Sequence, residues 1–119
     1  VDYLQLICER EGEVDWFKEL SLLLDIPIIL GSQMKRTVLD NPGNVPQEKD
    51  FHDGEEITAC ADTIIMLHHE RSYDDNAPKE ELRVMISRDR GKPVNRETVL
   101  HFDWEGAMLM EEEQESIAR

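Results

Sequence analysis

The sequence has few of the residues that hold small secreted domains together or carry proteins across membranes. Only two cysteines occur, Cys8 and Cys60, and each lies in an apolar stretch rather than in a ligand cluster. We therefore predict two buried thiols in a reducing cytoplasm, with a disulfide as the alternative. No apolar run approaches the roughly 20 residues of a membrane helix, and no signal-peptide pattern opens the chain. Secreted disulfide scaffolds and membrane-spanning proteins are therefore disfavoured classes.

Basic residues are also scarce. Thirteen Lys and Arg stand against 27 Asp and Glu, which gives a net charge of −14. This balance argues against tight binding of a phosphate backbone, except by a ring whose few basic groups all point inward. Glutamates gather near the end of the chain, at 111–113 and 115, so we expect 104–119 to be a solvated acidic tail.

What is present fits one globular domain with a modest core, because 39% of the 119 residues are hydrophobic and 34% are charged. The chain opens with Val1, without a methionine, inside an apolar run of β type. A domain rarely begins in mid-strand, so we expect this sequence to be a segment of a longer polypeptide.

Hydrophobic periodicity predicts a βαβ unit over the first part of the chain. Residues 1–8 form the first expected strand, and 26–32 form a second, central parallel strand. Between them we expect a helix from Val14 to Asp25, ended by Pro27. Its predicted apolar face carries Trp16, Phe17, Leu20, Leu23 and Leu24. The crossover should be right-handed.

The remainder predicts a long loop followed by further strands. Residues 35–56 are polar and contain Asn-Pro-Gly-Asn at 41–44, which is typical of a functional or mobile loop. After it we expect a helical turn at 55–60, a buried strand at 63–67 and a hydrophilic turn at 72–78. A half-exposed strand at 82–87, a basic turn at 88–95 and a strand at 98–103 complete the pattern. The last two strands predict an antiparallel hairpin at the edge of an otherwise parallel sheet.

Three short motifs carry the candidate chemistry. In VDYLQLI at 1–7, Asp2 offers a carboxylate. In IPIILGSQMKR at 26–36, Gln33 stands at the carboxyl end of a predicted strand, where α/β sheets bind ligands. In ISRDRGKP at 86–93, Arg88 and Arg90 are two positions apart, so in a strand both would point the same way.

Together and in this order, these motifs resemble the ATPase core of DnaB-type replicative helicases, over roughly residues 1–103. The resemblance implies an α/β fold that is the distal half of a RecA-like P-loop NTPase core, with a mostly parallel sheet and a C-terminal antiparallel hairpin. Within it, Asp2 would face Mg²⁺ through water, as the Walker B carboxylate does. Gln33 would sense the γ-phosphate of ATP. Arg90 would occupy the position of the arginine finger, and Arg88 a position that is usually Lys, so that both reach the γ-phosphate bound by a neighbouring subunit.

A fourth, less specific match covers residues 50–67, where the family has a DNA-facing loop followed by an Ala-Asp pair and an apolar strand. His52, Asp53, Gly54 and Glu55 replace the family's Arg-Glu-Ser-Gly. The replacement removes one phosphate contact, although backbone N–H groups near Gly54 remain available. Together with Arg36, these four residues are the candidate DNA contacts.

One motif of the family is missing: no G-x-x-x-x-G-K-[ST] phosphate loop occurs in the sequence. In the family, that loop and the catalytic Glu lie upstream of the Walker B strand. The resemblance therefore implies that this segment alone is inactive. It implies a longer parent that uses ATP and Mg²⁺, forms a homo-oligomeric ring such as a hexamer, and moves along single-stranded DNA. A helicase loader or primase would be a further partner.

Other readings stay open. The alternative from another class is a non-catalytic, acidic RecA-like module that binds a protein. Three metal-binding patterns are weaker alternatives. In one of them, two adjacent strand residues point to opposite faces, and the other two lack the required metal ligands or their spacing. The three patterns are His68 with His69, the HD-type phosphohydrolase pattern of His52, Asp53 and Asp62, and the EF-hand-like run 74–76.

Overall fold

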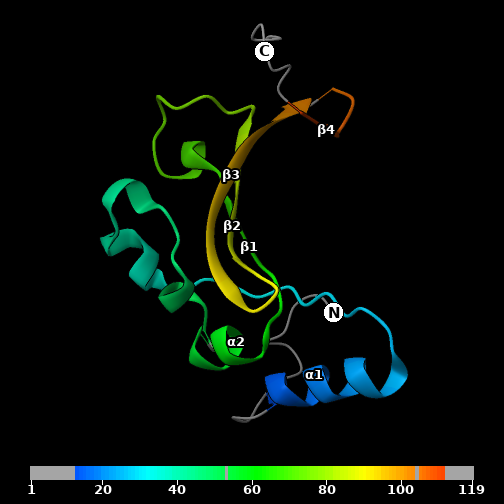
Figure 1. Ribbon diagram of the computed structural model, residues 1–119. Helices are drawn as coiled ribbons and strands as arrows, with labels where there is room; N and C mark the ends of the chain where they lie inside the picture. Colours follow the sequence, from blue (N-terminus) through cyan, green and yellow to red (C-terminus); the bar gives the residue numbers. More distant parts are fainter. Residues whose placement is uncertain (1–12, 53, 104, 112–119) are drawn as a thin grey trace, which may run out of the picture.

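The computed structural model describes residues 13–52, 54–103 and 105–111. Within them, four strands form one antiparallel sheet in the order β1-β2-β3-β4 (Figure 1). The strands are β1 (Ile64–His68), β2 (Glu81–Asp89), β3 (Lys92–Asp103) and β4 (Met108–Glu111). Consecutive strands are neighbours, so the sheet is a β-meander.

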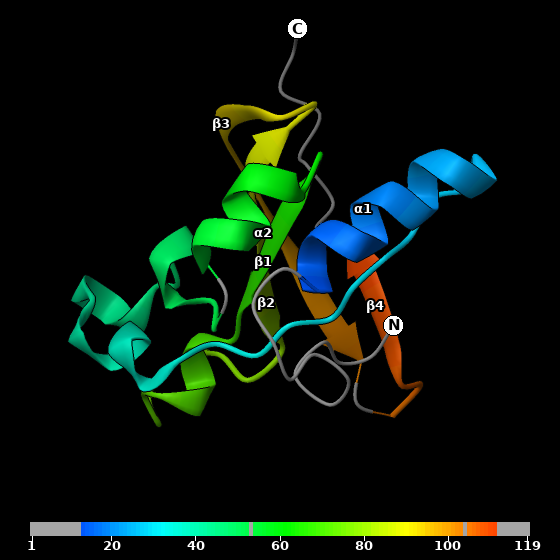
Figure 2. The same cartoon turned by 90° about the horizontal axis from the view of Figure 1, so that it is seen from below.

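Two helices pack together at one end of this sheet. They are α1 (Glu13–Leu24) and α2 (Gly54–Cys60), and Figure 2 shows them side by side from below. Apolar side chains from both helices, from the loop before α2 and from two strands form the core. They are Val14, Phe17, Phe51, Ile57, Ile64, Met66 and Met85.

The predicted first helix is confirmed, but only part of its predicted core face is buried. The helix ends at Leu24 because Asp25 takes a left-handed conformation, with φ of 51°, and Pro27 cannot continue it. Phe17 is buried, whereas Leu23 is 82% exposed. Trp16 and Leu24 are exposed as well, because the helix runs away from the sheet after its first turns (Figure 1).

The central parallel strand predicted over 26–32 is not found. This segment has no ladder partner among the described residues, and the next pairing is a single antiparallel bridge between Met34 and Phe51. Its predicted partner, 1–8, lies outside the described residues. An apolar run becomes a strand only where neighbouring backbone supplies hydrogen bonds, and the pattern alone does not provide that neighbour. The described sheet therefore contains no parallel pair.

The predicted C-terminal hairpin is confirmed and is tighter than expected. The basic turn predicted over 88–95 shrinks to Arg90 and Gly91, with φ of 52° and 73°. Positive φ at both central positions is typical of a type I′ turn, which suits the twist of an antiparallel pair. Pro93 is tolerated in β3 because β4 pairs only with Leu100–Asp103, so β3 has a free edge near Pro93 within the described sheet.

The strand predicted over 63–67 is found as β1 at the edge of the described sheet, but it is buried on one face only. Ile64, Met66 and His68 are buried, whereas Ile65 and Leu67 are exposed. At the other edge, residues 108–111, which the sequence placed in the acidic tail, form β4 against the end of β3.

The segment between Met34 and α2 is a compact loop of short 3₁₀ turns. They are η2 (Arg36–Asp40), η3 (Pro42–Asn44) and η4 (Glu48–Asp50). A further 3₁₀ turn, η5 (Glu70–Ser72), lies outside this segment and follows β1. We call residues 35–51 the polar loop. No helix within the described part of the chain has the length and apolarity to cross a membrane.

Candidate functional site

A buried carboxylate organises the polar loop. Asp50 is fully buried, and its Oδ1 accepts a hydrogen bond from the Thr37 hydroxyl at 2.7 Å. Its Oδ2 accepts from Asn41 Nδ2 at 2.7 Å and from the Gln47 backbone N–H at 2.8 Å. The Asn41 amide also donates to the Val45 carbonyl at 2.9 Å. One side chain thus fixes three separate points of the loop.

The charged form of Asp50 is favoured in this setting. Burial by itself raises the pKa of the carboxyl, but the donors from Thr37, Gln47 and Asn41 outweigh it and hold the pKa below 3.8. The sequence pattern did not single out this residue. A local signal was available, because Gln47 and Asp50 are spaced as a capping box, in which each side chain accepts from the other's backbone N–H.

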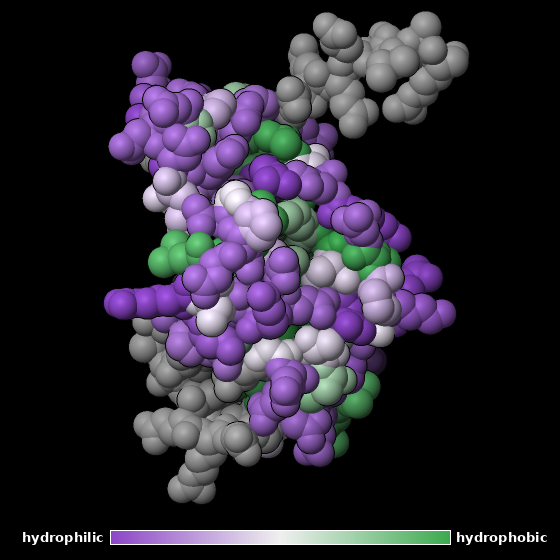
Figure 3. Space-filling view, turned by 90° about the vertical axis from the view of Figure 1, so that its left-hand side faces the viewer, coloured by the Kyte–Doolittle hydropathy of each residue, from purple (hydrophilic) through white to green (hydrophobic). Residues whose placement is uncertain are grey.

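The polar loop presents basic groups although the chain as a whole is acidic. Two of its three acids are engaged inward: Asp50 by the hydrogen bonds above, and Glu48 by Arg88 at 3.4 Å. Its basic side chains form no ion pair with the described residues; they are Lys35, Arg36 and Lys49. Figure 3 looks onto this side of the molecule, where hydrophilic side chains cover most of the face. The available charge of the loop is therefore positive.

The two candidate arginines occupy different surroundings. Arg88 lies in β2 with its side chain 15% exposed, and its Nη2 is 3.4 Å from Glu48 Oε2. Its Nη1 donates to the Gly91 carbonyl at 3.1 Å. Arg90 is exposed on the turn and has no hydrogen-bond or ion-pair partner among the described residues. Arg90 was expected in a strand, in line with Arg88, but it lies in a left-handed turn just after β2.

The other predicted residues that the structure describes lie next to the polar loop or within it. Asp2 and Asp53 lie outside the described residues. Gln33 is exposed and directly precedes the bridge that opens the loop, and Arg36 is exposed at the start of η2. His52 is exposed just after the loop.

Gly54 and Glu55 open α2, and Glu55 is exposed. The N–H of Gly54 already donates to the Phe51 carbonyl at 3.2 Å. A Cβ at Gly54 would lie 2.7 Å from the Glu48 carbonyl oxygen, so the close approach of α2 to the loop requires glycine.

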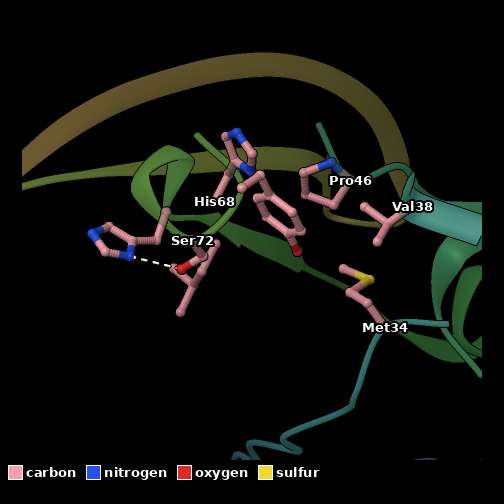
Figure 4. Close-up of a pocket in the computed structure, with 8 residues that line it drawn as sticks. Met34, Val38, Pro46, His68 and Ser72 are labelled. Atoms are coloured by element: carbon pink, nitrogen blue, oxygen red, sulfur yellow. Dashed lines mark hydrogen bonds between the residues drawn. The ribbon is translucent and has the colours of Figure 1, made fainter. Parts of the chain in front are cut away.

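A cavity of about 200 Å³ opens between the polar loop and the end of β1 (Figure 4). Apolar side chains form most of its wall, with two histidines and a serine at one side. The lining residues are Met34, Val38, Pro46, Leu67, His68, His69, Ser72 and Tyr73. The ring of His69 is held by Ser72 Oγ at 2.9 Å and by the Lys79 carbonyl at 2.9 Å.

His68 is the buried titratable group of this cavity. It is 2% exposed, and its ring stacks on Tyr73 with centroids 5.8 Å apart. Its Nε2 is buried and has no hydrogen-bond partner among the described residues. Burial, reinforced by the nearby Arg83, lowers the pKa of His68 below 6.5, so the ring is neutral at pH 7. Within the described ranges, no three His, Cys, Asp or Glu side chains form a metal-ligand group.

His68 is expected to make stability depend on pH. As the pH falls through 6.5, the unfolded chain binds a proton that the folded chain takes up only at lower pH, so the folded state loses stability below 6.5. The urea midpoint should fall between about pH 7.5 and 5.5, and His68→Leu should reduce that fall. Val38→Ala is the matched control, because it alters the same cavity without removing a titrating group. An equal fall in His68→Leu and wild type would contradict the assignment.

The thiol of Cys60 is unsuited to nucleophilic chemistry. It is unpaired and half-buried, and burial followed by the neighbouring Asp15 carboxylate raises its pKa. Cys60 is thus a free thiol, as predicted, but it is only half-buried, while Cys8 lies outside the described residues.

Comparison with known proteins decides the family. Residues 1–108 match the model of the DnaB-like helicase C terminal domain. This chain belongs to that family. The resemblance drawn from the three motifs is therefore confirmed.

The DnaB-like chain is similar to replicative helicases of several bacteria. It is 28% identical to a protein named probable plasmid replicative DNA helicase from Chlamydia psittaci, over 95% of this chain and 27% of the relative. It is 30% identical to the replicative DNA helicase DnaB of Mycobacterium leprae, over 85% and 18% respectively. A Chlamydia trachomatis plasmid replicative helicase is 32% identical over 87% and 23%. The chain thus spans about a quarter or less of these relatives.

Solved structures agree with this family at the level of the fold. One solved ATPase domain superposes with a TM-score of 0.74 at 24% identity, over 94% of this chain and 43% of that domain. A DnaB-like replicative helicase whose structure was solved to study its interactions with primase gives 0.71 at 23% identity, over 92% and 29%. The DnaB-like chain therefore has a RecA-like α/β fold, and its described sheet is antiparallel.

Proposed function

We propose that this chain is part of an ATP-driven, ring-forming replicative DNA helicase. The observation that carries the proposal is Arg90, a guanidinium exposed on a two-residue turn and without a partner among the described residues. An antiparallel hairpin holds this charge away from the core, which suits a group that acts on a neighbouring subunit. Membership of the DnaB-like family supplies the reaction that such a group would serve.

The residues present fit ATP as a shared ligand rather than one held by this chain alone. Arg90, with Arg88 behind it, would stabilise negative charge on the γ-phosphate bound by the next subunit. Gln33 would contact the nucleotide from its own subunit, and Asp2 would orient the water shell of Mg²⁺. Bound ATP supplies the phosphoanhydride whose hydrolysis drives the motor. Because the sequence lacks the phosphate loop, we expect the isolated chain to be inactive.

The polar loop is the proposed contact to single-stranded DNA. Three basic side chains of the loop form no ion pair with the described residues: Lys35, Arg36 and Lys49. They would bind phosphate in place of the family's Arg, whose position His52 occupies here. The two lysines were not predicted from the sequence, because formal charge does not show which acids are turned inward. Gly54 and Glu55 open α2 directly after the loop and would border this contact.

Exposed apolar side chains support the proposal that the chain is one part of a larger ATPase domain. Large apolar residues gather at the end of α1 and just after it. They are Leu22, Leu23, Leu24, Ile26 and Ile29, the last of which is 84% exposed. Contiguous exposed apolar surface of this kind normally packs against another element. The solved ATPase domain, of which this chain covers 43%, is large enough to supply one.

Partners follow from the same proposal. We propose a homo-oligomeric ring, a hexamer, in the cytoplasm, with a loader or primase as a further partner. Support comes from the family and from the primase studied with one structural neighbour. The alternative is an acidic, non-catalytic interaction module, which the net charge of −14 and His52 in place of Arg favour.

The deciding experiment uses the protein expressed from its complete coding sequence. ATP hydrolysis would be measured with and without single-stranded DNA, together with unwinding of a forked duplex and the salt dependence of DNA binding. The helicase proposal expects DNA-stimulated hydrolysis, unwinding and binding that weakens with salt. The isolated 119-residue chain, run in parallel, should show no turnover. A complete protein without turnover and without DNA binding would favour the interaction module.

A further inference from the structure

Arg88 is held within its own chain at both ends of its guanidinium. Nη2 lies 3.4 Å from Glu48 Oε2, and Nη1 donates to the Gly91 carbonyl at 3.1 Å. The side chain is 15% exposed and that of Glu48 is 25% exposed, so water screens the pair less than a surface ion pair. A guanidinium is always charged, and a buried one requires a nearby negative partner. In this chain that partner is Glu48.

Glu48 joins three elements at one point. It opens η4 of the polar loop, and its Oε2 also accepts from Thr58 Oγ1 of α2 at 3.4 Å. Its backbone carbonyl lies against Gly54, where a Cβ would come within 2.7 Å. The carboxylate that meets Arg88 is therefore fixed by the loop and by α2 together.

The turn that carries Arg90 is tied to the same network. The Gly91 carbonyl accepts from Arg88, and the Gly91 N–H donates to the Asp62 carbonyl at 2.9 Å. Asp62 is in turn paired with Lys18 of α1 at 2.6 Å. Arg90 itself makes none of these contacts. A shift of the polar loop would thus move the turn through Glu48 and Arg88.

From this geometry we infer that the Glu48–Arg88 pair is a positioning device that couples the polar loop to the Arg90 turn. Arg88 then acts through Arg90 instead of reaching across the interface itself. The inference rests on the proposed function, in which the loop faces DNA and Arg90 faces the neighbour's nucleotide. The structural link between the polar loop and the Arg90 turn can be tested without measuring ATP hydrolysis.

The structural test is hydrogen–deuterium exchange on the complete protein. Glu48→Gln keeps the shape of the side chain and removes its charge. It should speed exchange at the Gly91 amide and in the polar loop together, by about five-fold, as expected for loss of a coupled pair. Asp40→Asn is the matched control, because Asp40 is an exposed acid of the same loop and makes no hydrogen bond or ion pair to the hairpin among the described residues. Unchanged exchange at Gly91 in Glu48→Gln would overturn the inference.

The functional test uses the same complete protein and a double-mutant cycle of Glu48→Gln and Arg88→Gln. The measured quantity is the ratio of ATP hydrolysis with single-stranded DNA to hydrolysis without it. Each single variant should lower this ratio about five-fold, and the double variant should be no worse than either single one. Additive losses, or a ratio equal to that of Asp40→Asn, would overturn the coupling. If the unsubstituted protein neither hydrolyses ATP nor responds to DNA, the proposed function itself fails, while the exchange result still decides the link.

Discussion

Arg90→Ala in the complete protein is expected to abolish most ATP hydrolysis while leaving nucleotide binding nearly intact. Arg90 is exposed on the turn between β2 and β3 and has no partner among the described residues, so its removal disturbs none of the contacts described for the fold. A guanidinium supplied by a neighbouring subunit stabilises the charge of phosphoryl transfer and contributes about 10³–10⁵ in rate. The loss should therefore appear in kcat and not in the affinity for a fluorescent ATP analogue.

Lys92→Ala is the matched control for this prediction. Lys92 is an exposed cation two positions further along the same hairpin, so the control removes one positive charge from nearly the same place. It should change turnover only slightly. Mixing experiments provide a second test. If Arg90 acts on the neighbouring subunit, variant subunits should inhibit ATP hydrolysis in rings that also contain unsubstituted subunits. Near-normal turnover of Arg90→Ala would show that this guanidinium serves another purpose.

Among the substitutions considered, Asp50→Ala is expected to lower the free energy of unfolding most. The substitution leaves the Thr37 hydroxyl, the Asn41 amide and the Gln47 N–H without their shared acceptor inside the loop. Buried donors that lose their partner cost about 1–3 kcal/mol each when they cannot reach water. We expect the free energy of unfolding to fall by about 3 kcal/mol in total, since the loop can relax and hydrate part of this set. Urea denaturation measures the loss.

Two comparisons make this prediction specific. Asp50→Asn keeps the volume and one acceptor, so its loss should be smaller, whereas exposed Asp40→Ala should change stability by less than about 0.5 kcal/mol. The pH dependence has a definite sign. The pKa of folded Asp50 lies below 3.8, so its stabilisation is complete above 3.8 and is lost as the pH falls through the folded value. If Asp50→Ala unfolds at the same urea concentration as the unsubstituted chain, Asp50 does not organise the loop.

Local signals in the sequence were sufficient for the elements that depend on neighbouring residues. The helix over Glu13–Leu24 follows from a 3.6-residue period and ends where Asp25 and Pro27 stop it. The hairpin follows from two alternating strands around a glycine. The family could be inferred from three motifs, because their residue types and their order along the chain are properties of the sequence itself.

Tertiary structure alone decided which charges are available. Sequence spacing predicted that Arg88 and Arg90 reach the same partner together. Glu48, 40 positions before Arg88, instead binds Arg88, whereas Arg90 is exposed. Likewise, the net charge of −14 concealed a polar loop in which two acids are engaged inward and the lysines are not. An ion pair or a buried carboxylate depends on contacts between distant segments, and charge counting along the chain carries no information about them.

Strand pairing in the sheet was likewise decided by the tertiary structure. An apolar run at 26–32 has the composition of a central strand, but a strand exists only where a neighbouring strand pairs with it, and this run joins no ladder among the described residues. The sequence by itself determined the family, the helix and the hairpin, because each depends on residues close together in the chain. Only the folded structure decided which strands pair, which arginine is exposed and how Asp50 shapes the loop, because those outcomes depend on atoms that folding brings together.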